Sequence, residues 1–166
     1  EVKEGKNGCL LINDSYNSDL GALDLALDFL YRRSQSKGLK RTLILSDILE
    51  TGQNTPTLYR QVAQLVHSRG IERIIGVGGE ISSCAARFDI EKAFYPNTAA
   101  LAEAIGKGAL RLQDEIILIK GARKFGFDAL AEVLEKKVHE TILEVNLGAM
   151  VANLNRYRAM LRPETR

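Results

Sequence analysis

The feature that most constrains the fold is the alternation of short apolar runs and helical patterns along the whole chain. The first run is too short and too uniformly apolar for a helix and predicts a buried strand, and the later runs predict further strands. We expect such strands over residues 9–13, 41–47, 71–77, 93–95 and 116–119. The amphipathic segments between them predict helices over residues 20–36, 57–68, 81–87, 98–112 and 127–136.

Strands and helices in this order predict an α/β fold, with an open, doubly wound, mostly parallel sheet flanked by helices. Three clusters of short polar residues precede the longer helices and are good N-caps. The candidate caps are one of the residues 17–19 for the first helix, Asn54 or Thr55 for the second, and Asn97 or Thr98 for the fourth. The order of the strands stays open at this stage, because pairing depends on contacts far apart in the sequence.

Composition narrows the class of protein. With 166 residues, 45% hydrophobic and 27% charged, the chain suits one folded domain or one domain plus an appendage. A net charge of +2 argues against a nucleic-acid or membrane surface. Cys9 and Cys84 form no motif, and neither His67 nor His139 has metal-ligand company. No signal peptide or long apolar stretch is present, so we expect a cytoplasmic protein. The start at Glu1, without Met, suggests an excised piece of a longer chain, and trimming of the N-terminus is the alternative explanation.

Polar clusters follow three of the predicted strands, at residues 14–17, 47–50 and 120–123. Because parallel strands end at one edge of a sheet, we expect these clusters to converge on one ligand site. Asp14 and Asn17 could accept hydrogen bonds from ribose hydroxyls or other ligand donors. The last cluster is cationic and precedes a helix, which favours an anion.

Each cluster also has a purely structural interpretation. The first could cap a helix and close a turn, the second could be a solvated loop, and the third could be rim charges around a tight glycine turn. The run Gly76-Val77-Gly78-Gly79 lacks the third glycine of a dinucleotide-binding loop and is interpreted as a turn. No G-x-x-x-x-G-K-[ST] phosphate loop occurs in the sequence, so a triphosphate would be held mainly by another domain.

Three ordered stretches together resemble the C-terminal domain of the Mur ligases, over about residues 1–137. They are Asn13-Asp14-Ser15-Tyr16-Asn17 before a long helix, Leu45-Ser46-Asp47-Ile48-Leu49-Glu50-Thr51-Gly52, and Ile119-Lys120-Gly121-Ala122-Arg123. The second is similar to the family's G-D-M-x-E-L-G stretch and the third to its K-G-S-R turn. Within the family, the branch that joins D-alanyl-D-alanine to UDP-N-acetylmuramoyl-tripeptide is the most similar.

The resemblance implies an ATP-dependent ligase of peptidoglycan synthesis. ATP would phosphorylate the tripeptide carboxylate, and the dipeptide amine would attack the acyl phosphate. ATP and Mg²⁺ would be bound mainly by a preceding domain of the same chain, so this fragment would hold no metal ligand or catalytic residue and would be inactive alone. The implied nucleotide-binding residues are Asp14, Tyr16 and Asn17, and the implied substrate-binding residues are Asp47, Glu50, Lys120 and Arg123.

Two positions depart from the family pattern. Ser46 stands where the family usually has glycine, and Ala122 stands where it usually has serine. Both residues are small, so we expect the backbone geometry to be kept.

Residues 141–154 resemble a different family, the opening strand and helix of the alanine racemases. The sequence stops before that family's lysine, which carries pyridoxal phosphate. Residues 138–166 are therefore interpreted as a linker and the truncated start of a racemase domain, a C-terminal strand–helix appendage. The resemblance implies a fused ligase–racemase parent. The apolar face of the expected last helix also supports a hypothesis of self-association through residues 138–166.

A second hypothesis is a stand-alone, flavodoxin-like module that binds a nucleotide or Mg²⁺. In that case Asp14 and Asp47, at two strand ends, could hold the divalent cation. A third is an interaction domain without a ligand. The order of the three motifs favours the ligase.

Overall fold

The computed structural model describes residues 2–15, 19–49 and 51–136. The chain divides into two compact units, Glu1–Glu135 and Lys136–Arg166. Apart from Lys136, the second unit lies outside the described residues, and with it the strand and helix expected there. The fold and the site described below belong to the first unit.

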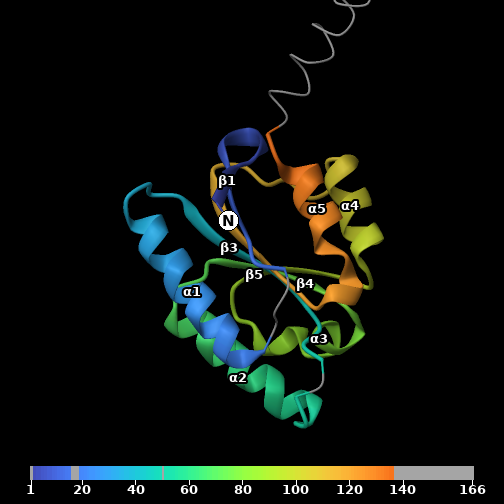
Figure 1. Cartoon of the computed structure of the whole chain (residues 1–166). Helices are drawn as coiled ribbons and strands as arrows, with labels where there is room; N and C mark the ends of the chain where they lie inside the picture. The colour runs from blue at the N-terminus through green and yellow to red at the C-terminus, as the bar shows by residue number, and fades with distance from the viewer. Residues whose placement is uncertain (1, 16–18, 50, 137–166) are drawn as a thin grey trace, which may run out of the picture. The chain divides into compact units, whose positions relative to one another are not determined.

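Within the described residues, six strands form one mixed sheet in the order β1-β2-β6-β3-β4-β5 (Figure 1). The strands are β1 Val2–Glu4, β2 Leu10–Asn13, β3 Lys40–Ser46, β4 Arg73–Val77, β5 Glu91–Tyr95 and β6 Glu115–Lys120. Only β1 runs antiparallel, beside β2, and the other pairs are parallel. The predicted mostly parallel α/β sheet is confirmed.

The register brings the carboxyl ends of the parallel strands to one edge. Asn13 at the end of β2 aligns with Ile119 of β6, and Lys120 aligns with Leu45 of β3. Ser46 in turn aligns with the last residue of β4. The segments that follow β2, β3 and β6 therefore begin next to one another, as expected for strand ends in a parallel sheet.

Helices connect the strands. The α-helices are α1 Leu20–Gln35, α2 Thr55–Ser68, α3 Gly79–Ser83, α4 Thr98–Gly106 and α5 Phe127–Leu134, and the short 3-10 helices are η1 Lys6–Gly8, η2 Ala85–Arg87 and η3 Arg123–Phe125. The side chains of Asp19, Asn54 and Asn97 accept hydrogen bonds from the first turns of α1, α2 and α4. These three contacts confirm the predicted N-caps.

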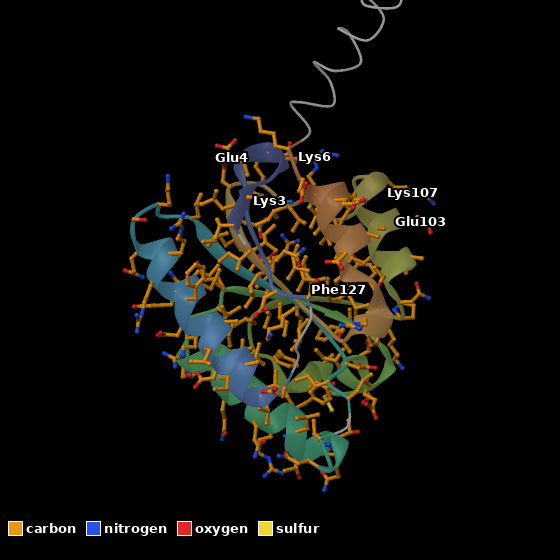
Figure 2. The ribbon with its side chains drawn as sticks, in the orientation of Figure 1. Lys3, Glu4, Lys6, Glu103, Lys107 and Phe127 are labelled. Atoms are coloured by element: carbon orange, nitrogen blue, oxygen red, sulfur yellow. The ribbon has the colours of Figure 1, made fainter. Side chains whose placement is uncertain are left out.

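The sheet separates two apolar clusters, because successive side chains of a strand point to opposite faces. Leu43 and Leu45 of β3 pack into the cluster under α1, α2 and α3, whereas Ile44 packs into the cluster under α4 and α5. Figure 1 shows these two groups of helices on opposite sides of the sheet. On the outer side of α4, Glu103 and Lys107 point away from the sheet and pair at 2.5 Å (Figure 2).

The structure differs from the sequence-based expectations at several element boundaries. The strand β1 was not expected, because it is a short edge strand with two exposed charged residues. Residues 81–87 divide into α3 and η2, and the strand expected at 93–95 begins at Glu91. The helix expected to reach residue 112 ends at Gly106, because Gly108 adopts a left-handed conformation with φ of 76°.

No helix in the described ranges combines the length and the apolar character that crossing a membrane requires.

Candidate functional site

An ion pair joins the ends of β2 and β6. Lys120 is the last residue of β6, its side chain is 0% exposed, and its Nζ lies 2.9 Å from Oδ2 of Asp14. Asp14 follows β2 directly, and its backbone N–H donates to the carbonyl of Ile119 at 2.9 Å. The Asp14 side chain is 45% exposed. The pair therefore fixes the carboxylate on its inner side while leaving it open to a ligand on the outer side.

A second link joins the end of β3 to the turn after β6. The buried Ser46 hydroxyl accepts a hydrogen bond from the backbone N–H of Ala122 at 2.8 Å and donates to the carbonyl of Asp47 at 2.9 Å. Gly121 lies between these groups, and a Cβ there would come within 2.6 Å of the Phe127 ring. The turn after Lys120 is thus held by Ser46 on one side and packed against Phe127 on the other.

Asp47 faces the start of α3. Its side chain is nearly buried, and the carboxylate accepts hydrogen bonds from the backbone N–H groups of Ile81 at 2.8 Å and Glu80 at 3.3 Å. It also lies under Gly78, whose φ is 128° and where a Cβ would come within 2.3 Å of the carboxylate carbon. This is the capping interaction that an acidic residue makes with unpaired helix N–H groups. The predicted contact of Asp47 with substrate stays a prediction.

Arg123 differs from Lys120 in its access to ligands. It begins η3 and is exposed, and among the described residues no ion pair or hydrogen bond of its guanidinium is recorded. The Thr98 hydroxyl donates to the carbonyl of Phe125 and ties η3 to α4. An anion approaching this edge could contact the exposed Arg123 guanidinium directly. It could not contact the Lys120 ammonium in the same way, because that group is buried and paired with Asp14.

The structure adds Asp128, which the sequence analysis did not select. Its Oδ1 accepts a hydrogen bond from the Ser15 hydroxyl at 2.8 Å and lies 3.4 Å from Nδ2 of Asn13. The sequence does show that Asp128 is an acidic residue in the first turn of a predicted helix, shortly after the third motif. It does not show that Asp128 contacts Ser15, because the two residues are 113 positions apart.

Four of the predicted site residues are described by the structure, and three are not. Among the four, Asp14 and Lys120 are in contact, and Asp47 and Arg123 lie at the same edge of the sheet. Tyr16, Asn17 and Glu50 are outside the described residues. Within the described ranges, no group of three or more His, Cys, Asp or Glu residues could hold a metal ion.

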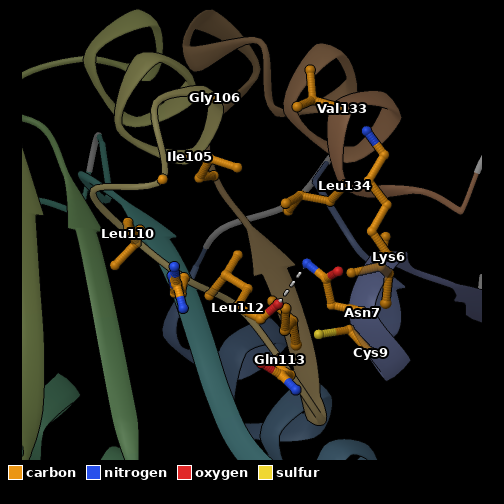
Figure 3. A pocket seen from close by; sticks show the side chains of 14 residues that line it. Lys6, Asn7, Cys9, Ile105, Gly106, Leu110, Leu112, Gln113, Val133 and Leu134 are labelled. Atoms are coloured by element: carbon orange, nitrogen blue, oxygen red, sulfur yellow. Dashed lines mark hydrogen bonds between the residues drawn. The ribbon is translucent and has the colours of Figure 1, made fainter.

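A cavity of about 470 Å³ lies at a different place in the molecule (Figure 3). It is lined by residues near the amino ends of β2 and β6 and by the last residues of α4 and α5. Its lining is largely apolar and includes Leu112 and Leu134. Burial raises the pKa of the Cys9 thiol, which also lines it. Of the predicted site residues that the structure describes, Asp14, Asp47, Lys120 and Arg123, none lines this cavity, so it is separate from the edge described above.

Comparison with known proteins gives two related ligases. The UDP-N-acetylmuramoyl-tripeptide--D-alanyl-D-alanine ligase of Escherichia coli (strain K12) is 27% identical over 128 residues, covering 76% of this chain and 27% of that protein. The ligase of the same name from Buchnera aphidicola is also 27% identical over 128 residues, covering 77% of this chain and 27% of that protein. The chain thus spans about 27% of the length of these curated relatives. No family model matches the sequence.

Solved structures agree on the fold. A crystal structure of MurF from Acinetobacter baumannii matches with a TM-score of 0.61 at 18% identity, covering 82% of this chain and 29% of that one. The MurF ligase from Thermotoga maritima in complex with ADP matches with a TM-score of 0.60 at 16% identity, covering 84% and 31%. The chain therefore has the α/β fold of one part of these ligases.

Proposed function

We propose that this chain is a domain of an ATP-dependent ligase that adds D-alanyl-D-alanine to UDP-N-acetylmuramoyl-tripeptide in peptidoglycan synthesis. Sequence similarity to two ligases of that name and the shared fold support the proposal. The observation that carries it is the contact between Lys120 and Asp14. It joins the first and third motifs of the resemblance at the edge where ligands of parallel sheets bind.

In this proposal the domain closes over ATP and the incoming dipeptide. Asp14, Tyr16 and Asn17 bind the nucleotide, with the exposed part of the Asp14 carboxylate accepting hydrogen bonds from ribose hydroxyls. Lys120 holds that carboxylate in place and balances its charge, and its predicted contact with substrate stays a prediction. Arg123 binds the phosphate or the carboxylate of the dipeptide, because its guanidinium is accessible and can contact two oxygens at once.

Two residues of the second motif complete the proposed substrate side. Asp47 shapes the loop after β3 through its contacts with the start of α3, and Glu50 follows in the same loop. Closure of the domain would exclude water and strengthen the charge interactions around the reacting groups.

The Mg²⁺ and the triphosphate are assigned mainly to another domain of the same protein. The support for this part is that the sequence contains no phosphate loop. The fragment is accordingly inactive alone, and the reaction takes place in the cytoplasm, where its ATP and nucleotide-linked substrate would be available.

For residues 138–166 we propose the start of an alanine racemase domain, fused to the ligase. The support is the sequence resemblance of residues 141–154. The pyridoxal phosphate and its lysine would belong to the racemase body. An assay of alanine racemisation on the full-length protein tests this part, and a full-length protein that ligates but does not racemise would refute the fusion.

The alternative of a stand-alone nucleotide or Mg²⁺ module is less well supported. Both acidic residues that would hold the cation are already engaged, Asp14 with Lys120 and Asp47 with the first turn of α3. Titration of the isolated chain with Mg²⁺ and nucleotides separates the two. Tight stoichiometric binding would favour the module, and weak or absent binding the ligase domain.

Two neighbouring cations allow a sharp test of the ligase proposal. In the full-length ligase, Arg123→Ala should lower kcat/KM for D-alanyl-D-alanine or ATP by at least about tenfold, the loss expected for one charge-assisted hydrogen bond. Lys124→Ala is the matched control, because Lys124 is also exposed and its ammonium lies 5.4 Å from the centre of the Phe125 ring. Equal activity of both variants and the wild type would count against the assigned role of Arg123.

A further inference from the structure

We propose that Asp128 is a positioning residue that holds Asp14 and Ser15, the described residues directly after β2, in place for ligand binding. The inference rests on the proposed function for the role of these two residues. Its structural basis is independent of function. Oδ1 of Asp128 accepts a hydrogen bond from the Ser15 hydroxyl at 2.8 Å and lies 3.4 Å from Nδ2 of Asn13. Ser15 directly precedes the proposed nucleotide-binding residues Tyr16 and Asn17.

Asp14 and Ser15 are held from two sides. On one side, Asp14 is fixed by the Lys120 ammonium and by the carbonyl of Ile119. On the other side, the adjacent Ser15 is fixed by Asp128 from α5. Ser15 is only 5% exposed, so its hydroxyl depends on a protein acceptor. Removing the Asp128 carboxylate would remove the attachment of Ser15 on the α5 side, while the contacts of Asp14 with Lys120 and Ile119 would remain.

The helix that carries Asp128 also supports the other motif. Phe127, its predecessor in α5, packs so closely on Gly121 that a Cβ there would come within 2.6 Å of the ring. Two consecutive residues of α5 thus contact the turn after β6 and the loop after β2. The helix fixes the distance between the proposed nucleotide side and the proposed anion side of the site.

The Asn13 amide indicates that this arrangement is not optimised for stability alone. A carboxylate only accepts hydrogen bonds, so Asn13 turns its Nδ2 toward Asp128. Its Oδ1 is then buried and, among the described residues, has no hydrogen-bond partner. Buried polar groups without partners are uncommon in native proteins, and local compromises of this kind concentrate at functional sites.

The contact itself can be tested on the 166-residue chain. In Asp128→Ala, hydrogen exchange at the Asp14 amide, followed by NMR, should accelerate about tenfold, the loss expected for one hydrogen bond to a charged group. Asp128→Asn keeps one acceptor oxygen and should give a smaller change. Glu132→Ala is the matched control, because it removes an exposed carboxylate one turn later on α5. Unchanged exchange in Asp128→Ala would overturn the proposal.

The functional consequence is tested in the full-length ligase. Asp128→Ala should raise KM for ATP about tenfold while kcat changes less, because positioning affects nucleotide binding first. Asp128→Asn should recover part of the loss, and Glu132→Ala should match the wild type. Ser15→Ala, which removes the same hydrogen bond from the other side, should raise KM similarly and add little to Asp128→Ala.

The two measurements separate the two ideas. Faster exchange with an unchanged KM for ATP would overturn the positioning role, although the contact exists. A wild-type full-length protein without ligase activity would overturn the proposed function. In that case the exchange experiment would still decide whether Asp128 holds Asp14 and Ser15 in place.

Discussion

Lys120 and Asp14 lie 106 residues apart in the sequence, and their side chains meet at 2.9 Å across the ends of neighbouring strands. The two partners differ in environment, since the Lys120 side chain is fully buried and that of Asp14 is nearly half exposed. A buried ammonium depends on its partner more than an exposed carboxylate does. The pair is therefore asymmetric, and removal of either member should have a different effect.

The first prediction follows from this asymmetry. Asp14→Ala should lower the free energy of unfolding by about 1–3 kcal/mol, because it leaves the Lys120 ammonium buried without this counter-ion. Lys120→Met should cost less, about 1 kcal/mol, because water can solvate the remaining carboxylate. Urea unfolding of both variants measures the difference. If Lys120→Met is the more destabilising change, the asymmetry is wrong.

A second prediction concerns the link between β3 and the turn after β6. Ser46→Ala removes the acceptor of the Ala122 N–H and should lower the free energy of unfolding by about 1–3 kcal/mol. Chemical denaturation provides the measurement. Ser68→Ala is the control, because that exposed hydroxyl donates to the carbonyl of Leu65 in its own helix. Its change should stay within about 0.5 kcal/mol. Similar values for the two variants would show that the link contributes little.

Both departures from the family pattern lie at this link. The resemblance places glycine at 46 and serine at 122, whereas this chain has serine and alanine. The Ser46 hydroxyl reaches the backbone of residue 122 from the β3 side. In this chain the hydroxyl that lies between the end of β3 and the turn after β6 therefore comes from residue 46.

Much of the fold could be predicted because its signals are local. Apolar runs identified β2, β3, β4 and β6 and the second part of β5, and short polar residues identified the caps of α1, α2 and α4. The strand order could not be predicted, because β6 pairs with β2 and β3 through contacts between distant segments. For the same reason β1 was missed, since Val2–Glu4 carries no pattern apart from its partner strand.

The site was predictable only as far as strand ends identify it. Asp14, Asp47 and Lys120 were selected because they follow apolar runs, and the structure places them at one edge. Asp128 was not selected, because a charged residue on an amphipathic helix is ordinary until a distant Ser15 is placed beside it. The capping role of Asp47 likewise depends on the position of α3, which its own motif does not encode.

A third prediction concerns acid stability at the opposite edge of the sheet. Glu91 pairs with Lys40 at 2.6 Å and with Arg73 at 2.8 Å. The pKa of Glu91 is lowered, chiefly by the hydrogen bond from Lys40 and further by the charges of Arg73 and Lys40. A lowered pKa stabilises the fold above the ordinary glutamate pKa of about 4.3. That contribution is lost as the pH falls through the lowered value.

Glu91→Gln should therefore destabilise the protein at pH 7, by about 0.5 kcal/mol because the carboxylate is half exposed. As the pH falls through the lowered pKa, the difference from the wild type should shrink, since the wild-type carboxyl then becomes protonated in the folded state as well. Unfolding curves at pH 7 and over an acid series measure this. Glu132→Gln, an exposed glutamate on α5, is the control. A difference that grows in acid would contradict the direction of the shift.

The last prediction separates the structural role of Asp47 from its proposed contact with substrate. Asp47→Ala removes the acceptor for the Glu80 and Ile81 N–H groups and should lower the free energy of unfolding by about 1 kcal/mol, as for other lost helix caps. Asp47→Asn keeps an oxygen for the 2.8 Å contact with Ile81 and should lose less stability. If Asp47 acts only through this cap, activity of the full-length ligase at a temperature where both variants are folded should be near wild type in Asp47→Asn. If its charge also contacts substrate, Asp47→Asn should raise KM for the dipeptide while its unfolding midpoint stays close to that of the wild type.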